Sequence, residues 1–235
     1  MSAVGSGAAA GRVARFIVVE GGEASGKSTQ ASRLAARLGA VLTHEPGATA
    51  LGARLRPLLL DPSIAGLSHR AEALMLAADR AQHVVETIRP HLDAGRDVVC
   101  DRYIASSLAY QGFGRGLSLD ELRDLSEWAA GGLWPDLTVL LDVPPEIAMQ
   151  RRGRTADRFE AEDAAFHRRV LAGYRALAAS EEHDWVVIDG TASPEDVEGA
   201  VWSAAVERLP DLADAVPAAR GDDAALGSNT SSEVP

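Results

Sequence analysis

One segment of the chain has the residue types and the spacing of a phosphate-binding loop. Residues 21–28 read Gly-Gly-Glu-Ala-Ser-Gly-Lys-Ser, which fits the pattern G-x-x-x-x-G-K-[ST]. Lys27 is the only lysine among the 23 Lys and Arg residues of the chain. A compact, strongly hydrated ammonium group is suited to reach between phosphates, whereas a guanidinium is a planar fork. The segment therefore predicts nucleotide chemistry.

The residues on either side of the loop predict the elements that it needs. Residues 16–19 form a short apolar, β-branched run typical of a buried strand, and residues 27–38 have apolar side chains at helical spacing. In a strand, loop and helix of this kind, backbone N–H groups and the positive end of the helix dipole face an anion. The residues expected to hold the nucleotide phosphates are Gly21, Gly22, Glu23, Ala24, Ser25, Gly26, Lys27, Ser28 and Thr29, and Ser28 also offers its hydroxyl to Mg²⁺.

The rest of the chain alternates between strand and helix patterns. Four further strands are predicted at 41–43, 97–100, 137–142 and 185–188. Of the helices between them, the longest is predicted from Ser68 to about Ala94, and two others begin at Ser118 and Ser193. This alternation predicts a P-loop NTPase-type three-layer α/β/α domain with a five-stranded parallel sheet. Ligands of such sheets bind at the carboxyl ends of the strands. Polar segments follow the first four strands in the sequence, which predicts a site at that edge.

Composition restricts the class of protein. With 235 residues and 46% apolar content, the chain can bury one core, which we expect at 15–209, flanked by a disordered extension at 1–14 and a disordered acidic tail at 210–235. A net charge of -11 argues against nucleic acid as a partner. No apolar run is long enough to span a membrane, and residues 1–14 lack a secretory pattern. Cys100, the only cysteine, is predicted to be a core thiol. We therefore expect a cytoplasmic protein. The six histidines have no metal-ligand spacing with the cysteine.

Several segments, taken together and in this order, resemble the bacterial thymidylate kinase family over about residues 15–208. They are the phosphate loop, THEPGAT at 43–49, LRPLLLD at 55–61, AADRAQ at 77–82 and DRYIASSLAYQG at 101–112, and RRGRTADRFE at 151–160 resembles the family's lid over ATP. The resemblance implies ATP- and Mg²⁺-dependent phosphorylation of dTMP to dTDP in dTTP biosynthesis. It also implies a helical lid at about 151–162 and a homodimer.

The resemblance assigns roles to the cationic side chains. Lys27 would hold the donor phosphates, Arg102 and Arg56 would bind the phosphate of dTMP, and Arg80 would lie beside its base and phosphate. The family delivers an arginine to the donor phosphates from the lid, and the candidates are Arg154 and Arg158 as catalytic residues, with Arg151 and Arg152 as neighbours. Taken alone, these four arginines also fit a solvated face paired with nearby acidic residues.

Polar and aromatic residues complete the implied site. Asp101 would join Ser28 in organising Mg²⁺, and Glu23 would face the 3'-hydroxyl of the deoxyribose. Tyr110 would occupy the space of a ribose 2'-hydroxyl. The remaining residues implied to contact dTMP are Glu45, Leu76, Ser106, Ser107 and Gln111.

The chain departs from the family pattern at three positions. Leu76 stands where the family has a phenylalanine that stacks on thymine, which contributes about 1–3 kcal/mol, so weaker binding of dTMP is expected. His44 replaces an arginine and Ala48 a glycine. Since histidine titrates near neutral pH, His44 predicts a pH dependence of the acceptor site. Two alternatives stay open: another small P-loop kinase for a nucleotide or nucleoside, and a nucleotide-binding regulator without turnover.

Overall fold

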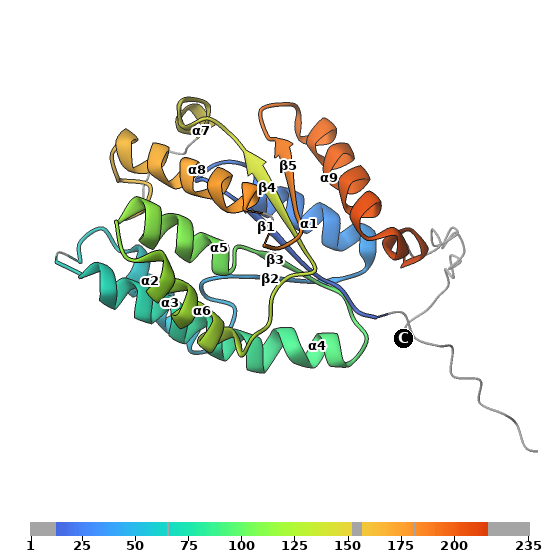
Figure 1. The fold of residues 1–235 in the computed structure, drawn as a ribbon, viewed down its shortest axis with the longest axis horizontal. Coiled ribbons are helices and arrows are strands. Elements are labelled where there is room, and N and C mark those ends of the chain that lie inside the picture. Colours follow the sequence, from blue (N-terminus) through green and yellow to red (C-terminus); the bar gives the residue numbers. More distant parts are fainter. Residues whose placement is uncertain (1–12, 65, 152–156, 181, 216–235) are drawn as a thin grey trace, which may run out of the picture.

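The centre of the fold is a parallel sheet of five strands (Figure 1). The computed structural model describes residues 13–64, 66–151, 157–180 and 182–215. The strands are β1 (Phe16–Gly21), β2 (Val41–His44), β3 (Val98–Asp101), β4 (Leu137–Asp142) and β5 (Trp185–Asp189), in the spatial order β2-β3-β1-β4-β5. Every neighbouring pair is parallel. The predicted five-stranded parallel sheet is confirmed.

Strand β1 is apolar along most of its length because both faces of the sheet are covered. Phe16 and Val18 pack into the core on one face, and Ile17 and Val19 pack into the core on the other. Alternate side chains of a strand point to opposite faces, so a strand buried on both sides needs a continuous apolar run. This explains why the first strand could be recognised without an alternating pattern.

Two helices cover one face of the sheet. They are α1 (Lys27–Leu38), which follows the phosphate loop, and α9 (Pro194–Arg208), which packs against α1. The 3-10 helix Pro210–Ala215 extends this layer, and its Leu212 is fully buried in the same core. The expectation that disorder begins at residue 210 is therefore wrong for residues 210–215, because Leu212 supplies apolar surface to the core. Residues 1–12 and 216–235 lie outside the described residues.

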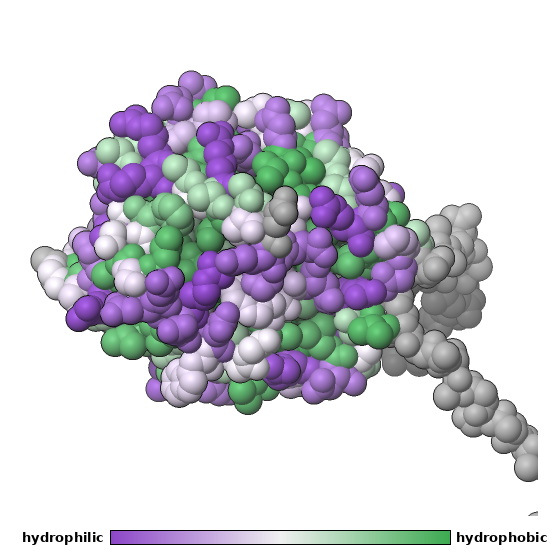
Figure 2. Space-filling view, viewed as in Figure 1, coloured by the Kyte–Doolittle hydropathy of each residue, from purple (hydrophilic) through white to green (hydrophobic). Residues whose placement is uncertain are grey.

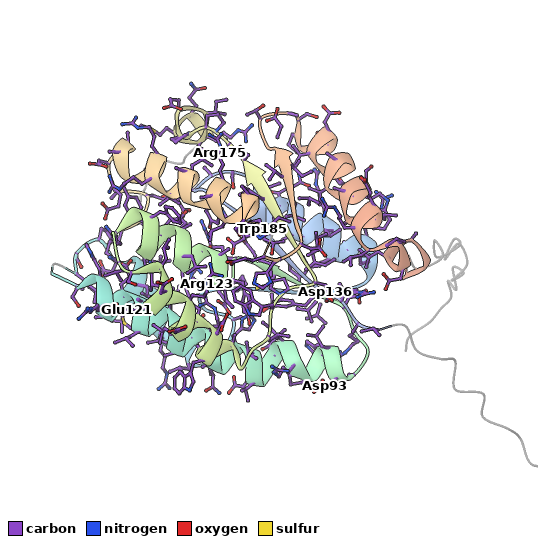
Figure 3. The ribbon with its side chains drawn as sticks, in the orientation of Figure 1. Asp93, Glu121, Arg123, Asp136, Arg175 and Trp185 are labelled. Atoms are coloured by element: carbon purple, nitrogen blue, oxygen red, sulfur yellow. The ribbon has the colours of Figure 1, made fainter. Side chains whose placement is uncertain are left out.

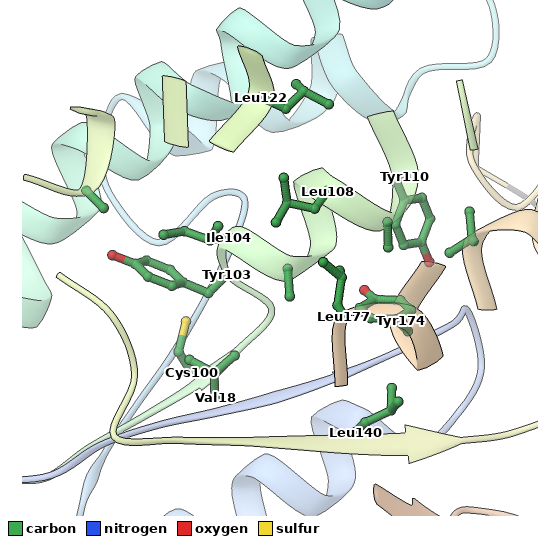
Figure 4. Close-up of a cluster of buried hydrophobic side chains, with 14 of the residues drawn as sticks. Val18, Cys100, Tyr103, Ile104, Leu108, Tyr110, Leu122, Leu140, Tyr174 and Leu177 are labelled. Atoms are coloured by element: carbon green, nitrogen blue, oxygen red, sulfur yellow. The ribbon is translucent and has the colours of Figure 1, made fainter. Parts of the chain in front are cut away.

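The opposite face carries more of the chain. Its helices are α3 (His69–His83), the π-helix η1 (Val84–Ile88), α4 (Arg89–Asp93), α5 (Ile104–Ser107), the π-helix η2 (Leu108–Gly114), α6 (Leu119–Ala130) and α8 (Ala164–Ala179). Figure 4 shows part of the core beneath them, with Cys100 and Val18 on the strands facing Tyr103, Leu108 and Tyr174. Cys100 is buried and free, as predicted for a core thiol. The short helices α2 (Gly52–Leu60) and α7 (Pro145–Arg151) complete the described elements.

Three helix starts agree with their sequence signals. Ser68, Ser118 and Ser193 accept hydrogen bonds through their side chains from backbone N–H groups three residues later, at the starts of α3, α6 and α9. The long helix predicted from residue 68 to about 94 continues through the π-helical turn at Val84–Ile88, just before Pro90. Hydrophobic spacing predicted its extent but gave no sign of the π-helical turn.

The surface is mostly polar. Figure 2 shows hydrophilic residues over much of one face, with smaller apolar groups between them. Among the described residues, no helix combines the length and the apolar character that a membrane crossing requires.

Candidate active site

The phosphate loop lies between the end of β1 and the start of α1. Lys27 Nζ donates to the carbonyl oxygen of Gly22 at 2.6 Å and lies 3.4 Å from Ser25 Oγ. A Cβ at Gly21 would lie 2.7 Å from the carbonyl oxygen of Leu141, and Gly26 has a positive φ of 92°, so both positions favour glycine. The backbone donors at the start of α1 are then close to the lysine, as an anion site requires.

The environment of Lys27 lowers the pKa of its ammonium group to about 8. Burial is the main cause, and the positive charge of Arg102 adds to it, while Glu23 and Asp101 act in the opposite direction. Phosphate oxygens next to Lys27 would favour the charged form. The site is thus prepared for an anion.

Ser28 and Asp101 meet at the predicted metal position. Ser28 Oγ donates to Asp101 Oδ2 at 2.5 Å, and Asp101 Oδ1 is buried without a hydrogen-bond partner among the described atoms. A hydroxyl oxygen and a carboxylate with one free oxygen fit Mg²⁺, which prefers oxygen ligands and is usually held by one or two protein groups together with substrate phosphates. In the described part of the chain, no cluster of three or more His, Cys, Asp or Glu side chains could hold a metal by itself.

Arg102 is the cation at the end of β3. Its backbone has a positive φ of 72°, and Nη2 donates to Glu23 Oε1 at 2.6 Å. Nη1 lies within 3.4 Å of the Gly21 carbonyl, Ser106 Oγ and Tyr174 Oη. Glu23 and Arg102, which were predicted separately as site residues, are therefore in direct contact beside the phosphate loop.

Two residues that the sequence analysis did not select hold this cluster in place. Glu20, which is fully buried at the end of β1, accepts hydrogen bonds from Ser106 Oγ at 2.7 Å, Tyr174 Oη at 2.9 Å and the backbone N–H of Tyr103 at 2.9 Å. Burial raises the pKa of Glu20, and these donors and Arg102 oppose that shift. A carboxylate in an otherwise apolar strand is the sequence signal that identifies Glu20. Tyr174 lies in α8 and has no comparable local signal.

Arg80 is an internal residue of the structure. Its side chain is 2% exposed and donates from Nε to Glu45 Oε2 at 2.9 Å and from Nη2 to Ser107 Oγ at 3.1 Å and the carbonyl of Tyr103 at 3.0 Å. A surface ion pair is thus excluded as an explanation for this arginine. Arg80 ties the segment after β2 to the segment after β3.

His44 ends β2, and the segment after it carries Glu45 and Pro46, the partner of Arg56. Arg56 Nη1 donates to the carbonyl of Pro46 at 2.6 Å. His44 lines the same cavity as Lys27 and Arg102. Partial burial, followed by the positive charge of Arg56, lowers the pKa of its imidazole below the usual 6.5. The neutral form of His44 therefore dominates at pH 7 and above, and the pH dependence expected from it moves to the acidic side of neutrality.

Tyr110 and Gln111 lie on η2, and both line the same cavity as Lys27. Tyr110 Oη donates to Glu23 Oε1 at 2.7 Å, and its ring packs edge-on against Phe159, with ring centres 5.7 Å apart. Gln111 is buried and donates to Glu72. Phe159 and Glu72 were not selected from the sequence. Phe159 belongs to the lid segment at 151–160, from which only arginines were selected, and Glu72 belongs to none of the motifs.

The lid arginines have different surroundings. Arg151 donates to the carbonyl oxygens of Gly190 and Thr191 at 2.8 and 3.1 Å, and it borders the cavity. Arg158 instead donates to Glu72 Oε2 at 2.6 Å and to the carbonyl of Leu59 at 2.8 Å, and it does not line the cavity. Arg152 and Arg154 lie outside the described residues.

One cavity of about 620 Å³ connects the phosphate loop to the acceptor residues. The predicted site residues that line it are Glu23, Ala24, Gly26, Lys27, Ser28, Thr29, Glu45, Arg56, Leu76, Arg80, Asp101, Arg102, Ser106, Ser107, Tyr110, Gln111 and Arg151. The polar segment after β4 does not line this cavity. Its Asp142 instead accepts two hydrogen bonds, at 2.8 and 2.9 Å, from Arg175 on α8 (Figure 3). A cavity of this size, lined by several cations and by apolar and aromatic side chains, suits a nucleotide.

Comparisons with known proteins agree with this geometry. The family described as Thymidylate kinase matches residues 19–201. A thymidylate kinase from Solidesulfovibrio magneticus is 52% identical over 201 residues, which are 80% of this chain and 96% of that protein. A thymidylate kinase from Deinococcus radiodurans is 47% identical over 200 residues, covering 82% of this chain and 97% of that protein.

A solved structure gives the same result. The crystal structure of thymidylate kinase from Ehrlichia chaffeensis superimposes with a TM-score of 0.67 at 32% identity, covering 82% of this chain and 98% of the other. Sequence, fold and cavity lead to one conclusion. The chain belongs to the thymidylate kinase family.

Proposed function

We propose that this protein transfers the γ-phosphoryl group of ATP to dTMP and releases ADP and dTDP. The observation that carries the proposal is the single cavity that joins Lys27 of the phosphate loop to Arg102 and Arg56 at a second cationic site. A protein that only binds a nucleotide needs one phosphate site. Two such sites in one cavity suit a transfer between two nucleotides, since positioning and charge neutralisation supply most of the catalysis of this reaction.

In the proposed reaction, an oxygen of the dTMP phosphate forms a bond to the γ-phosphorus, and the bond from that phosphorus to the β–γ bridging oxygen breaks. The attacking oxygen is already ionised, so no strong general base is needed. Lys27 would bind the donor phosphates, and Arg102 and Arg56 would align the acceptor phosphate. Ser28 and Asp101 would hold Mg²⁺, which when bound neutralises charge on the donor phosphates.

Glu23 would orient Arg102 and receive the 3'-hydroxyl of the acceptor, while Tyr110 closes the space beside the sugar. Arg151 and the arginines of the lid, Arg154 and Arg158, would approach the donor phosphates. Of these, Arg158 would first have to leave Glu72. We therefore favour Arg154 over Arg158 as the catalytic arginine of the lid.

We also propose that the protein is a homodimer that acts in the cytoplasm, where ATP is available. Large apolar side chains are exposed on adjacent elements: Leu58 on α2, Leu74 on α3, Val85 on η1 and Trp128 on α6. Trp128 is 81% exposed, which is unusual for so large an apolar group. Sedimentation analysis of the wild type and of Trp128→Glu tests this surface: a dimer that dissociates in the variant is expected, and a monomeric wild type would refute it.

The reaction is tested by ADP release with ATP and Mg²⁺ against dTMP, dUMP, dCMP, AMP, GMP, UMP and thymidine. We expect a preference for dTMP that disappears in Lys27→Ala. Preference for a different acceptor would identify another small P-loop kinase. ATP binding with no turnover of any acceptor would identify a regulator.

A further inference from the structure

Glu72 is a fully buried carboxylate that does not line the cavity but bonds to Gln111, which does. It lies on α3 and is 0% exposed. Its partners come from two other parts of the chain: Gln111 on η2 and Arg115 just after it, and Arg158 from the segment that follows α7. An isolated buried charge would be very costly, so a carboxylate in this position requires its partners.

The two oxygens of Glu72 have separate tasks. Oε2 accepts from Arg158 Nη1 at 2.6 Å, and Oε1 accepts from Gln111 Nε2 at 2.6 Å. Arg115 lies between them, with Nε 3.4 Å from Oε1 and Nη2 3.4 Å from Oε2. Every one of these hydrogen bonds is accepted by Glu72, and an ionised carboxylate has no proton to donate.

This arrangement determines which way the Gln111 amide points. The O and N atoms of an amide are ordinarily hard to tell apart, and the assignment depends on the hydrogen-bond partners. Because Glu72 can only accept, the NH₂ group of Gln111 must face it. The other atom, Oε1, is buried and has no partner among the described protein atoms. Leaving a buried acceptor without a partner destabilises the protein, so the position suits a ligand that donates a hydrogen bond.

We infer that Glu72 is a positioning residue that holds Gln111 with its carbonyl oxygen available to the ring N–H of a thymine base. This inference rests on the proposed function. Thymine has a hydrogen on N3, whereas N3 of cytosine is an acceptor and would oppose the Gln111 oxygen. Glu72 therefore contributes to the choice of dTMP over dCMP without touching either. Sites built around a hydrogen bond reject ligands that lack the matching group far more strongly than apolar pockets distinguish size.

The substitution Glu72→Gln tests the inference. An amide at position 72 can present either a donor or an acceptor to Gln111, so the Gln111 amide becomes free to turn over. We expect the KM for dTMP to rise about tenfold and the ratio of kcat/KM for dTMP over dCMP to fall at least tenfold. The matched control is Glu162→Gln, because Glu162 also accepts a hydrogen bond from Arg115, whereas Gln111 donates to Glu72. The control should keep the wild-type ratio.

The same measurements in a Gln111→Leu background separate positioning from a general loss of structure. Gln111→Leu alone should lower the ratio, and adding Glu72→Gln should lower it no further, because the group that Glu72 orients is gone. Either of two results would overturn the inference. One is a wild-type ratio of kcat/KM in Glu72→Gln, and the other is a fall of this ratio on adding Glu72→Gln to Gln111→Leu that is as large as the fall caused by Glu72→Gln alone. If Glu72→Gln does not fold, Gln111→Leu decides: a wild-type ratio there refutes the role of Gln111. Failure of the wild type to phosphorylate dTMP would refute the proposed function itself.

Discussion

The Arg102 guanidinium donates a hydrogen bond of 2.6 Å to Glu23 Oε1, and this links the phosphate loop to the end of β3. Glu23 Oε1 also accepts from Tyr110 Oη at 2.7 Å. A single carboxylate inside the phosphate loop therefore sets the position of the arginine that would bind the acceptor phosphate and of the tyrosine beside the sugar. Donor and acceptor sites are joined through this residue.

Glu23→Ala should weaken acceptor binding more than donor binding. It removes a hydrogen bond to a charged group, which contributes about 1.5–3 kcal/mol, so the KM for dTMP should rise roughly 10- to 100-fold. Initial rates at saturating ATP measure the effect. Tyr110→Phe is the control, because it removes the hydrogen bond from Tyr110 to Glu23 and leaves Arg102 in place; its effect should be smaller. Equal increases in the KM values of ATP and dTMP would contradict the role given to Glu23.

Binding of ATP should take up protons through Lys27. The pKa of this group is about 8 in the free protein, mainly because of burial, and nearby phosphates should raise it. Between pH 7 and pH 8.5, a growing fraction of the free protein has a neutral Lys27, so proton uptake on binding should increase over this range. Calorimetry in buffers of different ionisation enthalpy measures this uptake. The increase should be absent in Lys27→Ala, and uptake that is the same in both proteins would contradict the assignment.

Asp79 should make the free energy of unfolding depend on pH. Its side chain is 1% exposed, Oδ1 accepts from the backbone N–H of Gly47 at 3.0 Å, and burial, followed by the charge of Glu45, raises the pKa to about 6 from 3.8. The folded protein then keeps a proton that the unfolded chain has lost. This contribution to stability is fully present below about pH 4 and disappears as the pH rises through about 6.

Asp79→Asn keeps an acceptor for Gly47 and removes the charge. The variant should therefore gain about 1–3 kcal/mol relative to the wild type between pH 4 and pH 7. Urea unfolding across this range measures the difference. Asp93→Asn is the control, since Asp93 is an exposed aspartate at the end of α4 (Figure 3) and should give a constant difference from the wild type. A constant difference for Asp79→Asn as well would refute the prediction.

The sheet and the phosphate loop could be predicted because their determinants are local. β4 has the predicted bounds Leu137–Asp142, and the other strands agree within two residues, since buried runs and glycine positions depend on neighbouring residues in the chain. The polar segments after the first three strands also converge, as parallel strands require. The short helix at Pro210–Ala215 was missed because its acidic, small-residue sequence resembles a solvated tail, and only the tertiary position of Leu212 makes it part of the core.

The partners of the site residues could not be predicted in the same way. Arg158 was read as a lid residue facing the donor phosphates, yet its partner Glu72 is 86 residues away in the chain. Glu20 and Tyr174 are separated by 154 residues and meet only because α8 packs over η2 and the sheet. Motifs indicate which residues are near the nucleotide. Which of them hold the others in place depends on packing between distant helices.

Leu76→Phe should strengthen the binding of dTMP. Leu76 is partly exposed and borders the cavity, so a larger ring at this position would face the base, and stacking contributes about 1–3 kcal/mol. The KM for dTMP should fall about tenfold. The nearby Phe159 is 8% exposed and lines the same cavity. Leu74→Phe is the control on the same helix, since Leu74 is outside the cavity, and it should leave the KM unchanged. An unchanged KM in Leu76→Phe would mean that the base does not face this position.

The C-terminal boundary of the folded domain can be located by truncation. Leu212 is fully buried against the core that α9 covers, and Asp211 Oδ2 accepts a hydrogen bond from Arg15 Nε at 3.0 Å. A chain that ends at residue 215 keeps both contacts, whereas a chain that ends at residue 209 loses them. Because burying a leucine side chain contributes about 1.5–3 kcal/mol, the shorter chain should be less stable than the longer one by about that amount. Urea unfolding of the two chains measures the difference, and equal stability would show that residues 210–215 add nothing to the core.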